Sequence, residues 1–173
     1  DDERAVTGLA LSNLRSDAPD LPRGDLRRYT VPLSGGQATP ETLYRGPVEF
    51  PTINYRAVNG RRHRYVYLAE TDGESSLPTD VAKVDVDTGT VRRWRESGTH
   101  PGEPLFVPAP DADDEDDGVL LSVALDPEAN RSRLVCLDAA TLDELGRAQL
   151  PHRLPFGFHG QFYGPDAPGR SMA

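Results

Sequence analysis

The 173-residue amino-acid sequence predicts an all-β protein built from antiparallel hairpins. Short strand-like segments recur at intervals of about 8–12 residues, which is typical of antiparallel β-proteins. The 16 glycines and 16 prolines supply turns between them. A strand ending in Asp, a turn of small residues and a returning strand occur in succession twice, at 84–95 and 134–150. Such units indicate propeller blades of about 40–45 residues, of which this length would supply about three or four, too few to close a ring comfortably.

Most of the expected strands contain β-branched or aromatic residues and are bounded by turn-forming residues. Segment 1–25 is polar, and its spaced apolar residues from Val6 to Leu14 fit either a short helix or an irregular strand. Pro51 argues against a helix in the apolar stretch 48–55. In chain order, the expected strands are 26–33 and its hairpin partner 42–45 across the turn 34–36, then 48–55, 64–69, 81–87 with its period-two alternation, 90–95, 105–107, 119–125, 133–138 and 146–150.

The charge of the chain excludes one class of function and indicates an environment. A formal charge of −9 argues against binding to nucleic-acid phosphates, because that binding needs basic patches. Lys83 is the only lysine among the 19 basic residues. Many carboxylates and almost no lysine favour a halophilic source, where salt screens repulsion and hydrated carboxylates keep the surface wet. A GC-rich genome that prefers arginine codons is the alternative explanation.

Several further features limit the kinds of site. The single cysteine, Cys136, excludes a disulfide framework and a cysteine-rich metal site. The acidic run 111–117 is expected to be a solvated loop, because it lacks the glycine and the spacing of a calcium loop. No apolar run approaches the roughly 18 residues that span a membrane, and no segment resembles a signal peptide. A cytoplasmic chain without a transmembrane segment is therefore expected.

One histidine near the C-terminal end stands among aromatic residues and glycines. His159 lies in the stretch Pro-Phe-Gly-Phe-His-Gly at 155–160. On its own this pattern favours a core histidine over a metal ligand. Two carboxylates upstream change that interpretation, because each stands within two residues of a proline in an apolar context. They are Glu49 in Glu-Phe-Pro-Thr-Ile-Asn and Glu103 in Gly-Glu-Pro-Leu-Phe-Val.

These three segments, with Glu-Asp-Asp-Gly-Val-Leu-Leu-Ser-Val at 115–123, resemble the carotenoid cleavage oxygenases in order and wording. That family includes the retinoid isomerase of the retinal pigment epithelium. The resemblance covers 26–161 of a single segment, 1–173, and leaves 1–25 and 162–173 as loosely structured ends. It implies the C-terminal blades of a seven-bladed β-propeller, which form an incomplete ring in this chain.

The resemblance also implies a metal site. In the family, four histidines hold a non-haem Fe(II) on the propeller axis, and three of them donate their other ring nitrogen to glutamates. His159 is similar to the last iron ligand, and Glu49 and Glu103 are similar to two of those glutamates. A carboxylate on the second ring nitrogen fixes the tautomer and the direction of the imidazole. Each glutamate is expected to support a histidine, which need not be His159.

The other histidines match no ligand position of the family. His63 lies in an arginine-rich stretch, His100 in a turn, and His152 ahead of His159. One histidine cannot hold Fe(II) with useful affinity, because several ligands must offset the cost of dehydrating the ion. The resemblance therefore implies that this chain alone is catalytically incomplete.

The function implied by the resemblance is that of the C-terminal part of an Fe(II)-dependent dioxygenase. Such an enzyme uses O2 to split a double bond of a carotenoid or apocarotenoid into two carbonyl products. An upstream half of the same propeller is the expected partner, and the complete enzyme would be peripheral to a membrane. Two other interpretations stay open from the residues: an inactive gene remnant, and a metal-free β-domain that binds a partner or small ligand. In either case Glu49 would cap a turn and Glu103 would be an exposed loop acid.

Overall fold

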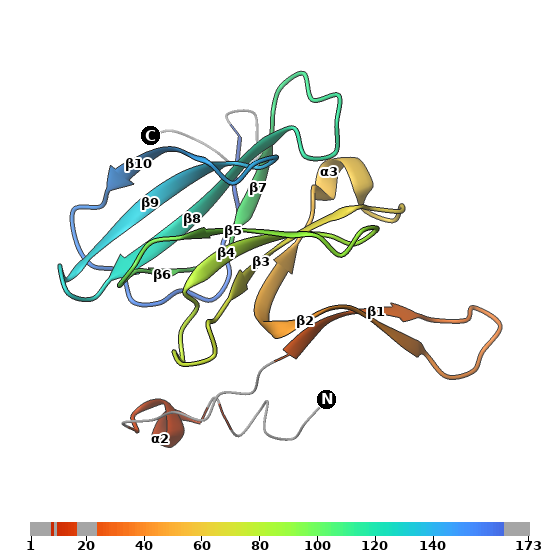
Figure 1. Cartoon of the computed structure of the whole chain (residues 1–173), viewed down its shortest axis with the longest axis horizontal. Helices are drawn as coiled ribbons and strands as arrows, with labels where there is room; N and C mark the ends of the chain where they lie inside the picture. The colour runs from red at the N-terminus through yellow and green to blue at the C-terminus, as the bar shows by residue number, and fades with distance from the viewer. Residues whose placement is uncertain (1–7, 9, 17–23, 165–173) are drawn as a thin grey trace, which may run out of the picture.

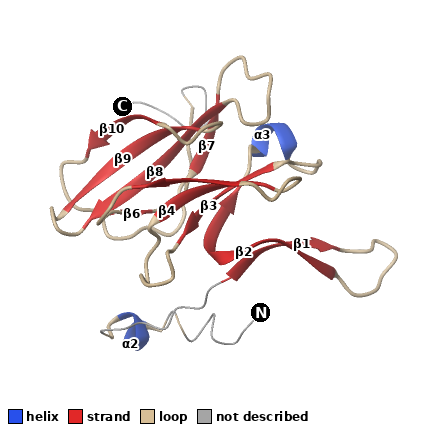
Figure 2. Cartoon of the chain, in the orientation of Figure 1, coloured by secondary structure: helices blue, strands red, loops and turns tan. Residues whose placement is uncertain are grey.

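Two antiparallel sheets packed against each other form the body of the molecule (Figure 1). The computed structural model describes residues 8, 10–16 and 24–164. Strands make up nearly all the regular structure there (Figure 2), with two short helices, α2 (Leu11–Leu14) and α3 (Tyr55–Val58). The expected all-β fold is confirmed, and the two sheets of the described residues do not close a ring. Within those residues no helix is both long and apolar enough to cross a membrane.

The first sheet contains five strands in the order of the chain. Leu26 lies opposite Tyr44, so the predicted pairing of 26–33 with 42–45 is confirmed. The β1–β2 hairpin extends away from the rest of the sheet (Figure 1). The strands are β1 (Gly24–Thr30), β2 (Thr39–Thr52), β3 (Tyr65–Glu70), β4 (Asp80–Asp85) and β5 (Val91–Arg95).

The second sheet has the order β10-β9-β8, and two short strands share the other side of β8. His100 pairs with Leu125 at one end of β8, and Leu105 pairs with Leu121 farther along. β6 and β7 therefore act as one strand interrupted at 102–104. The strands are β6 (His100–Pro101), β7 (Leu105–Pro108), β8 (Gly118–Asp126), β9 (Arg131–Asp138) and β10 (Glu144–Gln149).

The repeated unit predicted from the sequence is present once in each sheet. Asp85 Oδ1 accepts backbone N–H bonds from Asp87 and Thr88 at 3.0 and 3.2 Å, which closes the β4–β5 turn. Asp138 does the same for the β9–β10 turn. Because an aspartate side chain bonds the backbone two residues onward, each strand ends at the aspartate that caps its turn. β4 accordingly ends at Asp85, two residues earlier than the pattern indicated.

The main core lies between the sheets, and a second cluster covers the opposite face of the first sheet. β3 and β4 are consequently buried on both faces over most of their length. A strand covered on both faces needs a nearly continuous apolar run. The inter-sheet cluster contains Tyr67, Val81, Trp94, Leu120, Ala124, Val135, Leu137, Ala139 and Leu142, and the second cluster contains Leu26, Val48, Val66, Leu68, Ala82 and Val84.

Three local features differ from the sequence predictions or extend them. The open choice within 1–25 is settled at Leu11–Leu14, which is helical, whereas 1–7, 9 and 17–23 lie outside the described residues, as does 165–173. Segment 48–55 is a strand only to Thr52, and helix α3 follows because the Asn54 side chain accepts the Ala57 N–H at 3.3 Å. The sequence analysis did not predict this helix.

The prediction that the acidic run 111–117 is simply a solvated loop is wrong in part. Asp111, Asp113 and Asp114 are exposed. Glu115 and Asp116 instead turn toward the first sheet, where they bind backbone N–H groups and the Lys83 ammonium. The sequence does not indicate which of these acidic residues turn inward, because carboxylates can be solvated by water or can accept hydrogen bonds from buried donors.

Candidate metal centre

Glu49 and Glu103 both lie at irregular points of a sheet, within two residues of a proline. Glu103 occupies the gap between β6 and β7, where Pro101 and Pro104 lack the N–H groups that would continue the ladder. Glu49 lies at an irregularity of β2, where the register with β3 shifts between Glu49 and Thr52. Irregular strand positions turn side chains out of the regular alternation. Each carboxylate can therefore accept a hydrogen bond from a group outside its own sheet.

The structure brings Glu103 and His159 together. Glu103 Oε1 lies 3.2 Å from His159 Nδ1, and its Oε2 accepts the Gly160 N–H at 2.7 Å. A carboxylate can only accept, so Nδ1 must carry the proton of this contact. In the neutral imidazole this leaves the Nε2 lone pair available. Such an arrangement fits a histidine that binds a metal through Nε2.

Backbone geometry allows this close approach. A Cβ added at Gly160 would lie 3.1 Å from the Leu105 Cδ1 atom on β7, and so would crowd that strand. Glycine at 160 therefore lets the C-terminal segment lie against β7 while its N–H reaches Glu103. The Glu103 side chain is only 17% exposed, whereas the His159 side chain is 65% exposed. The interpretation of Glu103 as an exposed loop acid is wrong.

Aromatic rings hold the imidazole on two sides. The Phe50 and Phe158 rings stand edge-on to His159, with centroid distances of 5.5 and 5.0 Å. Phe50 adopts φ +53°, which is unusual for a residue with a Cβ atom. This backbone conformation and the shift in register accompany each other in β2. The segment that carries Glu49 thus contacts the segment that carries His159 through Phe50.

Glu49 has no such partner within the described residues. Glu49 is exposed, although the neighbouring chain desolvates its carboxyl enough to raise the pKa. No hydrogen bond to its carboxylate is found in the described part of the chain, so Glu49 and His159 are not joined directly. Partial desolvation disfavours the charged carboxylate, and a hydrogen-bond donor favours it. This chemistry fits a glutamate that supports a further imidazole.

The remaining histidines lie elsewhere. His100 Nδ1 is 3.0 Å from the Pro78 carbonyl oxygen, His63 lines a groove beside Leu26 and Ile53, and His152 is exposed. Among the residues that the structure describes, no group of three or more His, Cys, Asp or Glu side chains is placed to hold a metal ion. The residues present therefore fit one ligand of a metal site, His159, together with Glu103, the carboxylate that supports it.

An apolar groove of about 270 Å³ lies beside Glu103 and His159. Its floor is the outer face of β8 and β9, and its wall is the segment that follows β10. Leu150 N–H and Leu154 N–H tie this segment to Ser132 at 3.0 and 2.9 Å. The groove is lined by Leu121, Val123, Leu134, Leu154, Phe158 and Phe162 together with Glu103 and His159.

Sequence reasoning missed the contribution of Phe50 to this site. The residue was visible as part of Glu-Phe-Pro-Thr-Ile-Asn, but nothing in the pattern indicated a positive φ or a contact with His159. The contact joins residues 109 positions apart. Only the packing of two sheets brings them together.

Comparison with known proteins supports a common family for this arrangement. A family described as retinal pigment epithelial membrane protein matches residues 2–164. The chain is 46% identical over 128 residues to the mitochondrial carotenoid-cleaving dioxygenase of Mustela putorius furo, covering 71% of this chain and 23% of that protein. It is 38% identical over 160 residues to the chloroplastic carotenoid cleavage dioxygenase 8 homolog B of Oryza sativa subsp. japonica, covering 87% and 28%.

Solved structures agree. Cobalt-substituted apocarotenoid oxygenase from Synechocystis superposes with a TM-score of 0.77 at 30% identity, over 85% of this chain and 32% of that one. A chimera of that oxygenase with the retinal pigment epithelial protein gives a TM-score of 0.74 at 30% identity, over 83% and 32%. The chain thus spans between a fifth and a third of the length of these relatives. With the family match extending over nearly all of its residues, this chain belongs to the carotenoid oxygenase family.

Proposed function

We propose that this chain supplies the C-terminal part of a non-haem Fe(II) dioxygenase that cleaves a polyene double bond of a carotenoid or apocarotenoid. Iron, when bound, would supply the activation of O2 that yields two carbonyl products. The observation that carries the proposal is the contact of Glu103 with His159 Nδ1 at 3.2 Å, which leaves Nε2 for a metal. Relatives with names that specify carotenoid cleavage support the substrate class.

The roles of the chain's own residues follow from the geometry of the site. His159 would offer Nε2 as one metal ligand. Glu103 would hold the Nδ1 proton and, through the Gly160 N–H, fix the backbone beside the ligand. Glu49 would accept the ring N–H of a second histidine, which would offset the partial desolvation that raises the pKa of its carboxyl. The metal would be shared with histidines outside these 173 residues.

The apolar groove beside His159 would take part of the hydrophobic substrate. Its lining is chiefly aliphatic and aromatic, and such walls exclude water and orient a polyene by shape. Phe158 beside the imidazole is 63% exposed, and Phe162, which also lines the groove, is 49% exposed. A further part of the propeller packed over this face would bury these rings and complete the tunnel.

Supplying the missing part of the propeller tests this function. The N-terminal portion of Synechocystis apocarotenoid oxygenase, which lacks its own segment equivalent to this chain, can be co-expressed with it. We expect the two parts to purify together with iron and to cleave an apocarotenoid into two carbonyl products seen by chromatography. The isolated chain should bind no iron and show no turnover.

Two results would contradict the proposal. Iron bound one-to-one by the isolated chain would refute its incompleteness. A well-folded, tightly associated complex that takes up iron at the level of wild-type enzyme yet never cleaves a polyene would refute the substrate class. If the chain folds cooperatively without metal and does not associate with the N-terminal portion, the alternative interpretation as a metal-free binding domain would be favoured.

A further inference from the structure

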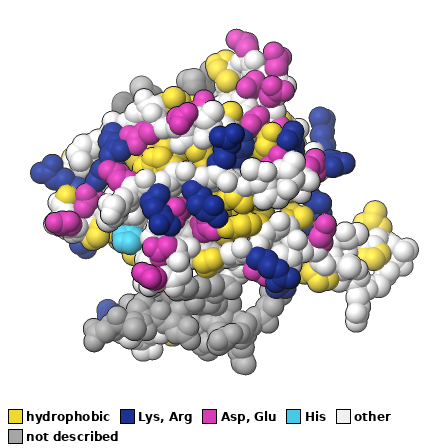
Figure 3. Space-filling view, in the orientation of Figure 1, with side chains coloured by type: hydrophobic (Ala, Val, Ile, Leu, Met, Phe, Trp, Pro, Cys, Tyr) yellow, Lys and Arg dark blue, Asp and Glu magenta, His cyan; other side chains and the backbone are white. Residues whose placement is uncertain are grey.

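The loop between β7 and β8 carries a dense set of acidic residues, and two of them face inward. Acidic side chains gather at the outer end of this loop in the space-filling view (Figure 3). Asp117 shapes the loop itself, because its Oδ2 accepts the backbone N–H groups of Asp113 and Asp114, each at 3.0 Å. Glu115 and Asp116, between them, leave the loop and reach the first sheet.

Glu115 binds the beginning of β3. Its Oε1 accepts the Tyr65 N–H at 2.8 Å, and both carboxylate oxygens accept the Arg64 N–H at 2.9 and 3.0 Å. Charge-assisted bonds of this kind are shorter and stronger than neutral ones. The Glu115 carboxylate thus accepts backbone N–H groups at the start of β3 that would otherwise bind water.

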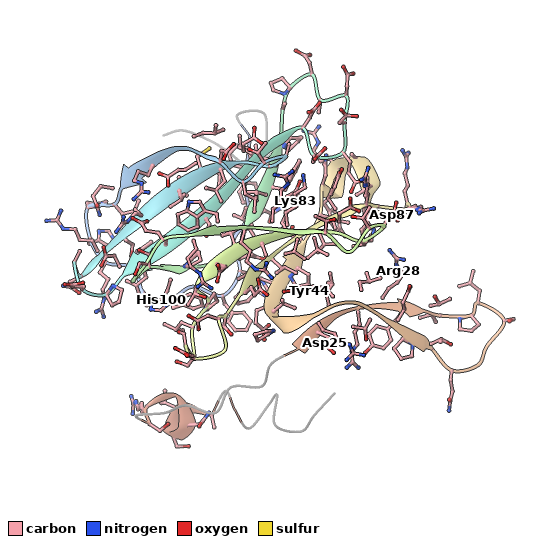
Figure 4. All side chains as sticks on the ribbon, viewed as in Figure 1. Asp25, Arg28, Tyr44, Lys83, Asp87 and His100 are labelled. Carbon is pink, nitrogen blue, oxygen red and sulfur yellow. The ribbon has the colours of Figure 1, made fainter. Side chains whose placement is uncertain are left out.

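Asp116 binds Lys83, the only lysine of the chain. Lys83 lies on β4 between the two sheets (Figure 4), and its side chain is only 6% exposed. Its ammonium also donates to the Ala140 carbonyl at 2.9 Å and stands 4.1 Å from the centroid of the Tyr65 ring. Both hydrogen-bond acceptors of the ammonium, Asp116 and Ala140, belong to loops of the second sheet, whereas the rings beside it, Tyr65 and Tyr67, belong to the first. A buried ammonium needs such a complete set of partners.

Asn54 completes the set and connects it to the candidate metal centre. Its side-chain amide donates to the Glu115 carbonyl oxygen at 3.0 Å, and the residue is only 2% exposed. Asn54 follows β2 by two residues, and β2 carries Glu49 and Phe50. The same segment is therefore held at two places to chain that adjoins the second sheet, by Asn54 on Glu115 of the β7–β8 loop and by the Phe50 ring on His159 after β10.

We propose that Glu115, Asp116, Lys83 and Asn54 form an inter-sheet clasp that positions the Glu49–Phe50 segment against His159. The clasp sets how the two sheets lie against each other. Phe50 belongs to the first sheet and His159 to the segment that follows β10 of the second sheet, so their edge-on contact depends on that setting. This inference deepens the proposed function, because the residues placed by the clasp are those of the proposed iron site. None of the clasp residues touches the site directly.

The test uses the intact metal-free chain and follows the His159 ring protons by NMR. The ring current of Phe50, which lies on β2 of the first sheet, shifts these protons, so their resonances report how close that sheet lies to His159. Glu115→Gln replaces a carboxylate by one carbonyl oxygen and an amide donor that opposes the backbone N–H groups. Asp116→Asn removes the charge that binds Lys83. We expect both variants to shift the His159 resonances at a temperature where each is fully folded.

Asp111→Asn is the matched control, because it removes the same charge from the exposed part of the same loop. It should leave the His159 resonances in place. Lowered stability in Glu115→Gln and Asp116→Asn with unmoved His159 resonances would overturn the proposal, since that result describes a merely stabilising contact.

Two further measurements keep the test decisive if Glu115→Gln does not fold. Asn54→Ser retains an oxygen for the Ala57 N–H but loses the amide donor to Glu115, and it should move the His159 resonances in the same direction. In the wild-type chain, the Tyr65 amide should exchange slowly with solvent; rapid exchange would contradict the bond to Glu115. Because no iron is needed, the result is independent of the iron loading that tests the proposed function.

Discussion

Replacing Glu103 by alanine should change the tautomer of His159. In the wild-type chain the carboxylate holds the proton on Nδ1 at 3.2 Å. A hydrogen bond to a charged group contributes about 1.5–3 kcal/mol where it is buried. The imidazole is 65% exposed, so solvent competes for the proton and about 1 kcal/mol is a reasonable remainder. The Nδ1–H form of the neutral ring should therefore fall about fivefold relative to the Nε2–H form.

Ring 15N chemical shifts at a pH where His159 is neutral measure this ratio. Glu103→Gln keeps a carbonyl acceptor and should restore part of the Nδ1–H population. Glu128→Ala, which removes an exposed glutamate from the β8–β9 turn, is the control and should leave the ratio unchanged. If Glu103→Ala retained the wild-type ratio, the carboxylate would not be what fixes the orientation of the imidazole.

Three other predictions concern the fold around the site. Leu120→Ala, at a fully buried position between the sheets, should lower the free energy of unfolding by about 2–5 kcal/mol in urea titrations, whereas Leu145→Ala at a 60% exposed position should change it by less than about 0.5; equal losses would contradict the assigned core. Phe50→Gly should be more stable than Phe50→Ala by about 1 kcal/mol, because alanine keeps the strain of φ +53°; the reverse order would refute that strain. Arg64 and the turn N–H groups lower the pKa of Asp85 to about 2, below the unfolded value of about 3.9, so its stabilisation is complete above about pH 4 and is lost as the pH falls toward 2. Asp85→Asn should flatten that part of the stability–pH curve, and an unchanged slope would contradict the assignment.

The hairpins of the fold could be predicted because their signals are local. Asp85 and Asp138 cap turns with their own side chains, and β4, β5 and β9 beside these turns carry valines. The turn and the strand propensity therefore agree within about ten residues. Burial of β3 and β4 on both faces could not be predicted in this way, because it depends on what packs against the sheet.

The candidate site likewise has residues that the sequence identified and contacts that it could not indicate. Glu103 and His159 were identified by their motifs, and the structure adds that they contact each other. The inward turn of Glu115 and Asp116 had no local signal, since an acidic run also describes a solvated loop. Their partners, Tyr65 and Lys83, lie 50 and 33 positions away. Contacts of such sequence separation arise from the packing of the two sheets.

Iron content of the reassembled protein tests the central claim most directly. The chain would be purified with the N-terminal portion of Synechocystis apocarotenoid oxygenase, and iron per complex would be measured for wild type, His159→Ala and His152→Ala. His152 is exposed, lies seven residues from His159 and serves as the matched histidine control. We predict that the wild type and His152→Ala carry iron and that His159→Ala carries none while still forming the complex. Iron retained at the wild-type level in the His159→Ala complex would contradict the assignment of His159 as a ligand.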